Sequence, residues 1–538
     1  MADRRRQGPS ATPAREVVMV GAPRPLKVVR GTRGPRSRPV RWPFLVAIAM
    51  LAVAALVAAA PPGSGATVYD PRDAALRREV SKVMSDPSVT ASTARVGAVV
   101  ADASTRRQVY VRYANTPLAP ASAQKTFTAA AAMYHLGTGY RWSTDVYSAP
   151  LQAGGVVPGR LYLKGRGDPT LLERDLTAMV SGLRAKGVTR VAGDVVADAS
   201  YFDDVRYSPY WSTSYASSYY AAQVSALTLS PDTDYDAGTV IVAATPSTST
   251  ALAPRITLTP PTASTHVTVV NKARTSAAGT ATTIAVSRKA GTNIVTVTGQ
   301  VPVKHAAAKK WVTVNDPALL AGRAFRARLV AAGIRVDGTA VRGTTPSGQV
   351  LLTRHSSMTL GRLLVPFLKL SNNSHGEAIA KTLGARATGK GTWASGTAVL
   401  RAYAARIGIS TTGMRFVDGS GLARANRLTP NQLAGLLDKV QRTSWWATFR
   451  GALPVAGTDP VRWTGGTLAK RMRGTAAAGN LRAKNGNLTG VTSLAGYVTG
   501  ADGRRYVFVV MSTFSGTSPR PVEDRLGVLL AGWRMANR

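Results

Sequence analysis

No cysteine occurs in the 538 residues of the sequence. This absence excludes disulfides, thiolate zinc sites, iron–sulfur clusters and a cysteine nucleophile. An oxidising compartment stays open, because a chain of this length can bury cores large enough to fold without disulfides. The five histidines are scattered and no pair of them has the spacing of metal ligands, so we expect each to be structural. The sequence therefore predicts no metal site and no cofactor.

Acidic residues are scarce, with 27 Asp and Glu against 68 Lys and Arg and a formal net charge of +41. This charge favours anionic partners in general, and nucleic acid, an anionic membrane face and wall polymers all qualify. Hydrophobic residues make up 45% of the chain, as in an ordinary globular protein. No segment of about 20–50 residues repeats, which argues against a solenoid.

The basic residues are densest at the N-terminus, where residues 1–41 hold 11 Lys and Arg and two acids. This segment is rich in Pro and Gly and is predicted to be a disordered basic tail. Residues 42–60 follow as an uncharged segment whose apolar run, 17 residues from Phe44, is just long enough to span a bilayer. The long basic lead favours a transmembrane anchor, while Ser64-Gly65-Ala66 leaves open a cleaved signal peptide.

Basic residues beside an apolar span stay on the cytoplasmic side of the membrane. We therefore expect the chain from about residue 61 onward to lie outside the cytoplasm. It would be held at the cell membrane by a single N-terminal span, or secreted if that segment is cleaved. Nucleic acid then drops out as a partner, and the positive charge suits a protein that works against anionic membrane and wall surfaces.

After a linker at 61–68, the chain divides into three parts. Residues 69–145 and 353–538 mix helical and strand patterns and are predicted to be two halves of one α/β (α+β) domain. Residues 146–352 differ in character and are predicted to be inserted between those halves. Within them, Thr- and Val-rich stretches at about 236–302 alternate with period two, which predicts a small β-rich subdomain.

Ser122 and Lys125 stand three residues apart, just before a predicted helix over Thr126–Leu136. At this spacing, two side chains lie on the same face of a helix. The N–H of a serine at a helix start can hold an oxyanion. Lysine can act as a base only if burial or a nearby cation lowers its pKa. By itself the pattern also fits an N-cap beside a surface lysine.

Two further motifs follow in order, Ser371-Asn372-Asn373 after an apolar helical stretch and Lys484-Asn485-Gly486 before a predicted strand. Ser-x-x-Lys, Ser-x-Asn and Lys-x-Gly in this order are the three elements of the penicillin-interacting serine enzymes. From about residue 70 to its C-terminus, the chain resembles the serine-type D-alanyl-D-alanine carboxypeptidases of the class C penicillin-binding proteins. The long insertion supports this resemblance, as do the segments Gly167–Leu171, Asp418–Leu422, Leu453–Gly457 and Ser493–Tyr497.

The resemblance implies a penicillin-binding and β-lactamase-like transpeptidase domain, an antiparallel sheet with helices, interrupted by the inserted region. It implies a serine D,D-carboxypeptidase, with D,D-endopeptidase activity as a second reaction of the same site. The substrates would be D-Ala-D-Ala or cross-linked stem peptides of peptidoglycan, hydrolysed through an acyl-enzyme. β-Lactams would inhibit the protein by acylating the same serine.

The resemblance also implies a role for each motif residue. Ser122 attacks the carbonyl of the penultimate D-alanine, and Lys125 accepts the proton. Ser371 relays a proton toward the leaving amine, Asn373 holds the peptide carbonyl of the substrate, and Lys484 supplies positive charge near its carboxylate.

The remaining roles concern the oxyanion and the substrate. The backbone N–H groups of Ser122 and Asn487 form the oxyanion hole, and Asn485, Gly486 and Asn487 bind substrate. Arg424 contacts the diaminopimelate side chain of the wall peptide, with an ordinary surface position as the alternative.

Two departures from the family pattern bear on activity. The third motif is usually Lys-Thr-Gly-Thr, and Asn485 and Asn487 replace both threonines, whose hydroxyls normally bind the substrate carboxylate. An asparagine amide can also donate, but it is longer. Some family members bind the free amine of the substrate with an acid from the insertion, and no acid occurs from Val205 to Pro231. Either Tyr219 or Tyr220 lines the cleft instead, or both serve packing.

Three alternatives stay open on the sequence alone. The first is a catalytically impaired wall-binding or scaffold homologue whose third motif has changed. The second is a β-lactamase, which needs a deacylating glutamate near the second motif; Glu377 is nearby, but its helical pattern fits a surface position better. The third is a Ser-His-Asp triad, which lacks a supporting Gly-x-Ser-x-Gly between a strand and a helix.

Overall fold

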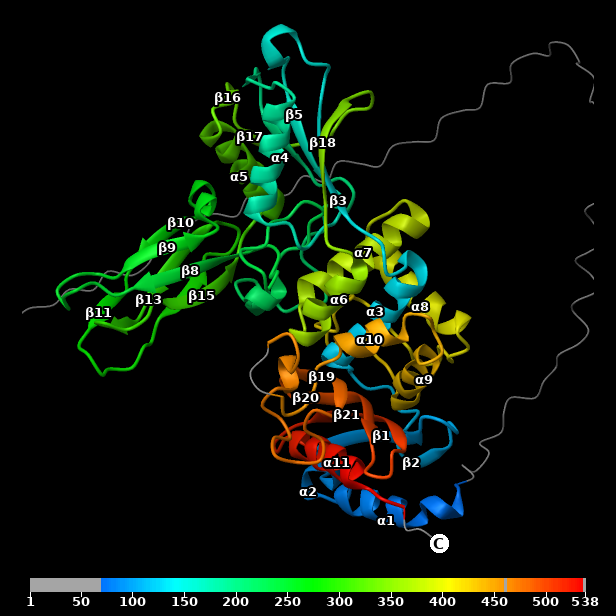
Figure 1. Ribbon diagram of the computed structural model, residues 1–538. Helices are drawn as coiled ribbons and strands as arrows, with labels where there is room; N and C mark the ends of the chain where they lie inside the picture. Colours follow the sequence, from blue (N-terminus) through cyan, green and yellow to red (C-terminus); the bar gives the residue numbers. More distant parts are fainter. Residues whose placement is uncertain (1–68, 459–461, 536–538) are drawn as a thin grey trace, which may run out of the picture. The chain divides into compact units, whose positions relative to one another are not determined.

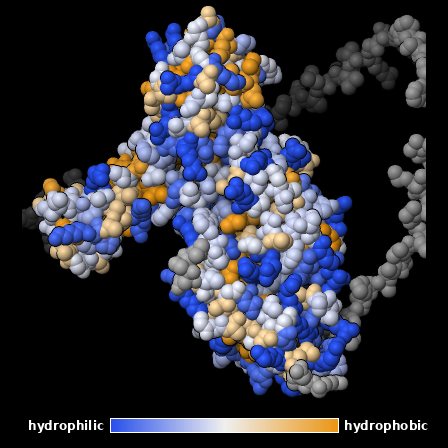
Figure 2. All heavy atoms as spheres, viewed as in Figure 1, coloured by the Kyte–Doolittle hydropathy of each residue, from blue (hydrophilic) through white to orange (hydrophobic). Residues whose placement is uncertain are grey.

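The computed structural model describes residues 69–458 and 462–535, which belong to one unit, Thr67–Arg538. The predicted basic tail, membrane segment and linker, residues 1–68, lie outside the described residues. Within the described ranges, no helix combines the length and the apolar character needed to cross a membrane. Figure 2 shows hydrophilic residues spread over the visible face, with hydrophobic residues in scattered patches.

A five-stranded antiparallel sheet joins the two distant parts of the chain, in the order β19-β20-β21-β1-β2 (Figure 1). Nine residues of β1 pair with β21. The predicted antiparallel sheet with helices is therefore confirmed, built from both halves of the domain. Its strands are β1 (Ala94–Asp102), β2 (Gln108–Arg112), β19 (Arg482–Leu488), β20 (Val491–Thr499) and β21 (Arg505–Phe514).

Both faces of this sheet are covered by helices, which is why the segment of β21 reads as an almost continuous apolar run. Alternate side chains separate two cores. Phe508 and Val510 pack with α1 (Ala74–Val83) and α11 (Arg520–Gly532), near the short α2 (Pro87–Thr90). Val507, Val509 and Met511 face a helical layer, which consists of α3 (Lys125–Leu136), α6 (Leu360–Lys369), α7 (Asn373–Thr388), α8 (Trp393–Arg406), α9 (Pro430–Val440) and α10 (Trp446–Ala452).

The inserted region leaves and rejoins this domain through two adjacent antiparallel strands, β3 (Ser143–Ser148) and β18 (Val350–Ser356). They belong to a second five-stranded sheet, ordered β17-β7-β5-β3-β18, and α4 (Glu173–Ala185) and α5 (Pro317–Ala331) pack on it. The predicted boundaries at 146 and 352 fall inside these two strands. The other strands of this part are β4 (Val156–Val157), β5 (Leu161–Gly165), β6 (Arg190–Val191), β7 (Val195–Asp198), β16 (Arg335–Val336) and β17 (Ala340–Arg342).

A β-rich part of the insertion buries valines from several small sheets, among them Val242, Val297 and Val312. It extends past the predicted end at 302, because β15 pairs with β8. The sequence around β15 is rich in Ala and Lys and lacks the alternating pattern of the earlier strands, so the predicted subdomain did not include it. The strands are β8 (Thr239–Thr245), β9 (Arg255–Thr259), β10 (Thr268–Asn271), β11 (Arg274–Ser276), β12 (Ala285–Arg288), β13 (Ile294–Thr298), β14 (Gln300–Pro302) and β15 (Ala308–Thr313).

Candidate active site

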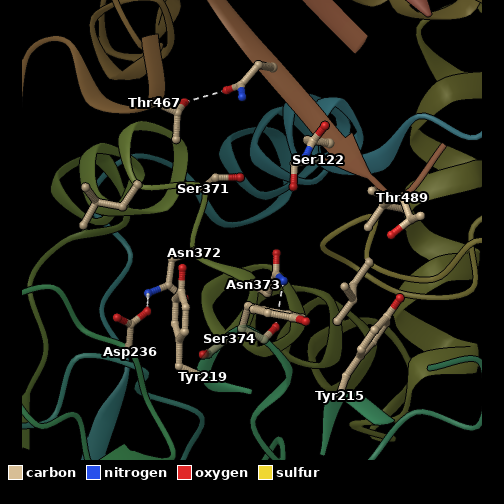
Figure 3. A pocket seen from close by; sticks show the side chains of 16 residues that line it. Ser122, Tyr215, Tyr219, Asp236, Ser371, Asn372, Asn373, Ser374, Thr467 and Thr489 are labelled. Atoms are coloured by element: carbon tan, nitrogen blue, oxygen red, sulfur yellow. Dashed lines mark hydrogen bonds between the residues drawn. The ribbon is translucent and has the colours of Figure 1, made fainter. Parts of the chain in front are cut away.

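A cavity of about 460 Å³ brings the predicted motifs together (Figure 3). Ser122, Ser371, Asn373, Asn485 and Asn487 all line it. Lys125, Lys484 and Gly486 lie beneath its wall, and Arg424 lies outside its lining. The other lining residues are Tyr215, Tyr219, Tyr220, Asp236, Leu370, Asn372, Ser374, Leu422, Thr467, Leu488 and Thr489.

Ser122 sits in a 3₁₀ turn, Ala121–Gln124, directly before α3. Its neighbours Ala121, Ala123 and Gln124 are buried, while Ser122 is partly exposed to the cavity. Ala121 has a φ of +46°, a left-handed conformation that costs energy for a residue with a side chain. The surrounding packing must therefore hold this turn in place.

Two glycines allow other segments to pack directly against that turn. A β-carbon on Gly486 would lie 2.8 Å from the carbonyl oxygen of Pro120. A β-carbon on Gly421 would lie 1.9 Å from the carbonyl oxygen of Ala121. The third motif and the Asp-Gly-Ser-Gly segment thus need glycine because their backbones touch the turn that presents Ser122.

Lys125 is fully buried and its Nζ is surrounded by oxygen atoms from three separate segments. Nζ lies 2.9 Å from Ser122 Oγ, 2.6 Å from Asn373 Oδ1 and 2.8 Å from the carbonyl oxygen of Ser420. The alternative of a surface lysine beside an N-cap is therefore wrong. The distance to Ser122 is short enough for direct proton transfer.

Burial sets the charge state of both lysines of the site. It lowers the pKa of Lys125 to about 7, although the carboxylates of Glu377 and Asp418 oppose the shift. Burial and the neighbouring Lys125 lower the pKa of Lys484 well below its ordinary value. Near pH 7, Lys125 can thus exist as a neutral amine next to Ser122, and a general base must be in this form.

Glu377 fixes the backbone segment that contacts Lys125. It does not lie on the helix surface, where the sequence pattern predicted it. Its side chain is fully buried in α7. Its carboxylate accepts hydrogen bonds from the backbone N–H groups of Gly419 and Ser420, both at 2.9 Å, and from Trp393 Nε1 at 2.7 Å. These bonds hold the Ser420 peptide, whose carbonyl accepts from Lys125. The surface prediction failed because the residue's partners come from a segment about 40 positions later in the chain.

The second motif leads into α7, with Asn372 as its N-cap, and its first residue has unusual backbone geometry. Ser371 has a φ of +60°, and its side chain lines the cavity near Ser122 (Figure 3). Asn373 Oδ1 accepts from Lys125, and its Nδ2 donates to the carbonyl of Tyr220 at 2.7 Å. The second hydrogen of Asn373 Nδ2 therefore remains free to donate to a substrate carbonyl, as the predicted contact requires.

The third motif lies within the edge strand β19, where the outer backbone groups of the sheet are free to meet the 3₁₀ turn. Lys484 Nζ donates to the backbone carbonyl of Asn485 at 2.7 Å and does not reach the cavity. Arg424 donates to the carbonyl of Thr489, which lines the cavity. Arg424 is exposed and is linked by this hydrogen bond to the β19–β20 turn, and its predicted contact with the wall peptide stays a prediction.

Asp236 and Thr467 line the cavity although the sequence analysis did not single them out. Asp236 lies five residues beyond the stretch that was searched for an acid, and its Oδ1 accepts from Asn372 Nδ2 at 3.0 Å. Burial and the neighbouring Asp232 raise the pKa of Asp236 to about 7. Tyr219 and Tyr220 were predicted either to line the cleft or to pack, and both line the cavity. In residues 69–458 and 462–535, no cluster of His, Asp or Glu could hold a metal.

Comparisons with known proteins cover most of the chain. A family model described as the D-Ala-D-Ala carboxypeptidase 3 (S13) family matches residues 76–532. Over 518 residues, the chain is 38% identical to a D-alanyl-D-alanine carboxypeptidase from an Actinomadura species, an alignment that covers 95% of this chain and 93% of that protein. It is 26% identical over 475 residues to carboxypeptidase DacB from Mycolicibacterium smegmatis, covering 85% of this chain and 83% of the relative.

A solved structure with a similar fold is that of penicillin binding protein 4 (dacB) from Haemophilus influenzae. The TM-score is 0.69 at 21% sequence identity, and the match covers 84% of this chain and 97% of the other. The same protein in complex with a β-lactam matches with a TM-score of 0.65. This likeness concerns the fold, and it confirms the predicted α/β fold of penicillin-binding type.

Replacing Glu377 by Gln tests the support beneath Lys125. A glutamine can accept from only one end of its side chain, so at least one backbone N–H of Gly419 or Ser420 would face another donor. Leaving a buried donor unsatisfied costs about 1–3 kcal/mol, and we expect Glu377→Gln to lower the free energy of unfolding in urea by that amount. Glu79→Gln, which removes an exposed ion pair with Lys82, is the control and should cost under about 1 kcal/mol. Equal effects of the two variants would contradict this assignment.

Proposed function

The chain belongs to the D-Ala-D-Ala carboxypeptidase 3 (S13) family, and from this membership we propose the chemical roles of its site residues. The protein is a serine-type D-Ala-D-Ala carboxypeptidase that acts on peptidoglycan stem peptides. The observation that carries the proposed roles is the buried Nζ of Lys125, 2.9 Å from Ser122 Oγ. A non-catalytic scaffold would have no need to keep a lysine buried against a serine that faces a cavity.

In the proposed acylation step, Ser122 Oγ attacks the carbonyl carbon of the penultimate D-alanine, and Lys125 Nζ takes the hydroxyl proton. The backbone N–H groups of Ser122 and Asn487 hold the oxyanion that forms. The C–N bond then breaks, and the terminal D-alanine leaves with a proton relayed through Ser371. The acyl group stays on Ser122 as an ester.

In the second half of the reaction, water attacks the ester and Ser122 regains its proton. Lys484 lies below the cavity wall. Although burial lowers its pKa, a bound substrate carboxylate favours its charged form, and in that form it contributes positive charge near the carboxylate. A β-lactam enters the same pathway, because its strained amide is attacked by the same serine. A cross-linked stem peptide differs only in its leaving group, so an endopeptidase reaction would use the same acyl-enzyme.

We also propose that residues 42–60 hold the protein at the cell membrane with the catalytic part outside the cytoplasm. The support is the basic composition of residues 1–41, since such residues stay on the cytoplasmic side. Peptidoglycan, the substrate, lies on the other side of the membrane from these residues. Secretion after cleavage near residue 66 is the alternative.

Labelling with a fluorescent penicillin tests the role of Ser122. We expect one covalent label per chain in the wild type and none in Ser122→Ala, because the variant lacks the nucleophile. Ser81→Ala, on the exposed side of α1, serves as the control and should label like the wild type. A label that survives in Ser122→Ala would contradict the proposed nucleophile. Assays of D-alanine release from a pentapeptide and of cleavage of a cross-linked dimer then rank the two peptidase reactions.

The rate of acylation should depend on pH through Lys125. Only the neutral amine can accept the serine proton, and its pKa is lowered to about 7. The second-order rate constant for penicillin labelling should therefore fall about tenfold per pH unit below pH 7 and level off above about pH 8. Lys125→Arg, which cannot deprotonate, should lose about 10²–10⁴-fold in rate. A rate that is flat from pH 5.5 to 8.5 would rule out Lys125 as the base.

A reporter fusion tests the location of the catalytic part. An alkaline phosphatase fused at the C-terminus of the full chain is active only outside the cytoplasm, and we expect it to be active. If residues 42–60 act as an anchor, the activity sediments with membranes. Replacing the apolar residues of this segment by a charged linker should abolish it. An inactive fusion to the full chain would contradict the proposed location.

A further inference from the structure

Asn485 stands where penicillin-interacting serine enzymes usually carry threonine after the lysine of the third motif. A threonine hydroxyl rotates to suit its partner. An asparagine amide instead has one acceptor end and one donor end, held rigidly opposite each other. The end that faces the cavity therefore decides whether residue 485 attracts or repels a carboxylate.

Two donors meet the side-chain oxygen of Asn485. Thr467 Oγ1 donates to Asn485 Oδ1 at 2.5 Å, the bond drawn from Thr467 in Figure 3. Lys484 Nζ approaches the same oxygen at 3.4 Å. Lys484 Nζ acts as a donor here, so Oδ1 is the amide end turned toward this side. The Thr467 hydroxyl, which could also accept, therefore donates to Oδ1, and Nδ2 is left for the cavity that Asn485 lines.

Thr467 is itself held in place by the end of α6. It lies in a 3₁₀ turn, Gly466–Leu468, and a β-carbon on Gly466 would be 2.4 Å from the carbonyl oxygen of Lys369. The buried side chain of Lys369 donates to the carbonyls of Leu453 and, at 2.7 Å, Thr464. Lys369 precedes the second motif by two residues, so the turn with Thr467 is anchored to the same helix end as Ser371.

Charge divides the cavity into two ends. Figure 3 shows Thr467 and Asp236 well apart, with Ser371 and Asn372 between them. Asp236 is the acidic residue of the cavity lining, and its Oδ1 accepts from Asn372. When ionised it repels a substrate carboxylate from its end of the cavity. The donors of Thr467 and Asn485, with Lys484 below, lie at the other end.

We propose that Thr467 is a positioning residue for substrate specificity, which orients the Asn485 amide so that Nδ2 donates to the C-terminal carboxylate of the stem peptide. The Thr467–Asn485 pair thereby replaces the single threonine hydroxyl of the usual motif. This inference rests on the proposed function, because the substrate must present that carboxylate. Without the Thr467 hydroxyl, Oδ1 keeps only the longer contact with Lys484 Nζ, so the amide is held less firmly and can turn its oxygen toward the carboxylate, which repels it.

The test compares two peptides that end in D-Ala-D-Ala, one with a free carboxylate and one with a C-terminal carboxamide. Thr467→Val keeps the shape of the side chain and removes its hydroxyl. We expect kcat/KM for the free acid to fall about 10- to 100-fold, mainly through KM, the usual effect of losing a hydrogen bond to a charged group. The value for the carboxamide should change less than twofold, and Thr467→Ser should restore the wild-type preference.

Two further variants separate positioning from a general disturbance of the loop. Thr464→Val makes the same change three residues earlier, where only the backbone carbonyl takes part in the network, and should keep the wild-type preference. In an Asn485→Thr background, Thr467→Val should have no further effect on the acid preference, because the amide that it orients is gone. Equal losses on both peptides, or an undiminished effect in the Asn485→Thr background, would overturn the inference.

The outcome also separates this inference from the proposed function. If the wild type releases D-alanine from neither peptide and Ser122 takes no penicillin label, the proposed function fails. If the wild type is active and Thr467→Val keeps its full preference for the free acid, the proposed function stands and the positioning role of Thr467 is wrong.

Discussion

The hydrogen bonds of the buried Lys125 Nζ hold the active site together. Its three oxygen partners come from the turn before α3, from the start of α7 and from Ser420, which follows Lys125 by 295 positions in the sequence. A buried amine with no such partners would cost several kcal/mol, so these segments must meet wherever the lysine is buried. The same burial that demands these contacts also lowers the pKa of the lysine. The burial of Lys125 is thus the common cause of the contacts that hold the three segments together and of the lowered pKa that lets the lysine act as a base.

Hydrogen bonds from other parts of the fold hold this arrangement in place. Asp418 accepts from the N–H groups of Gly421 and Ala423 and from Trp211 Nε1, so an indole of the inserted region helps to fix the segment beside Lys125. The inserted region also supplies tyrosines and Asp236 to the cavity wall. Although the insertion leaves and rejoins the domain through β3 and β18, it is part of the site and not an appendage to it.

The sequence was sufficient to predict the features that depend on local residue types. The order of the three motifs pointed to a family resemblance, which implied the reaction and the antiparallel sheet, and the period-two pattern indicated the β-rich part of the insertion. Features that depend on distant partners could not be predicted in this way. Glu377 looks like a surface helix residue until Gly419 and Ser420 are seen to donate to it. Thr467 carries no motif, and only the folded chain brings it to Asn485.

The central claim is that burial lowers the pKa of Lys125 to about 7, so that a substantial fraction of the side chain is neutral near pH 7 and can take the proton of Ser122. The most direct measurement is an NMR titration of the Lys125 side chain in ¹³C-lysine-labelled protein, with its resonance assigned by Lys125→Arg. The account predicts a midpoint near the lowered value of about 7. A midpoint near the ordinary lysine value of 10.5 would contradict it, because the side chain would then be a cation at the pH where the enzyme works.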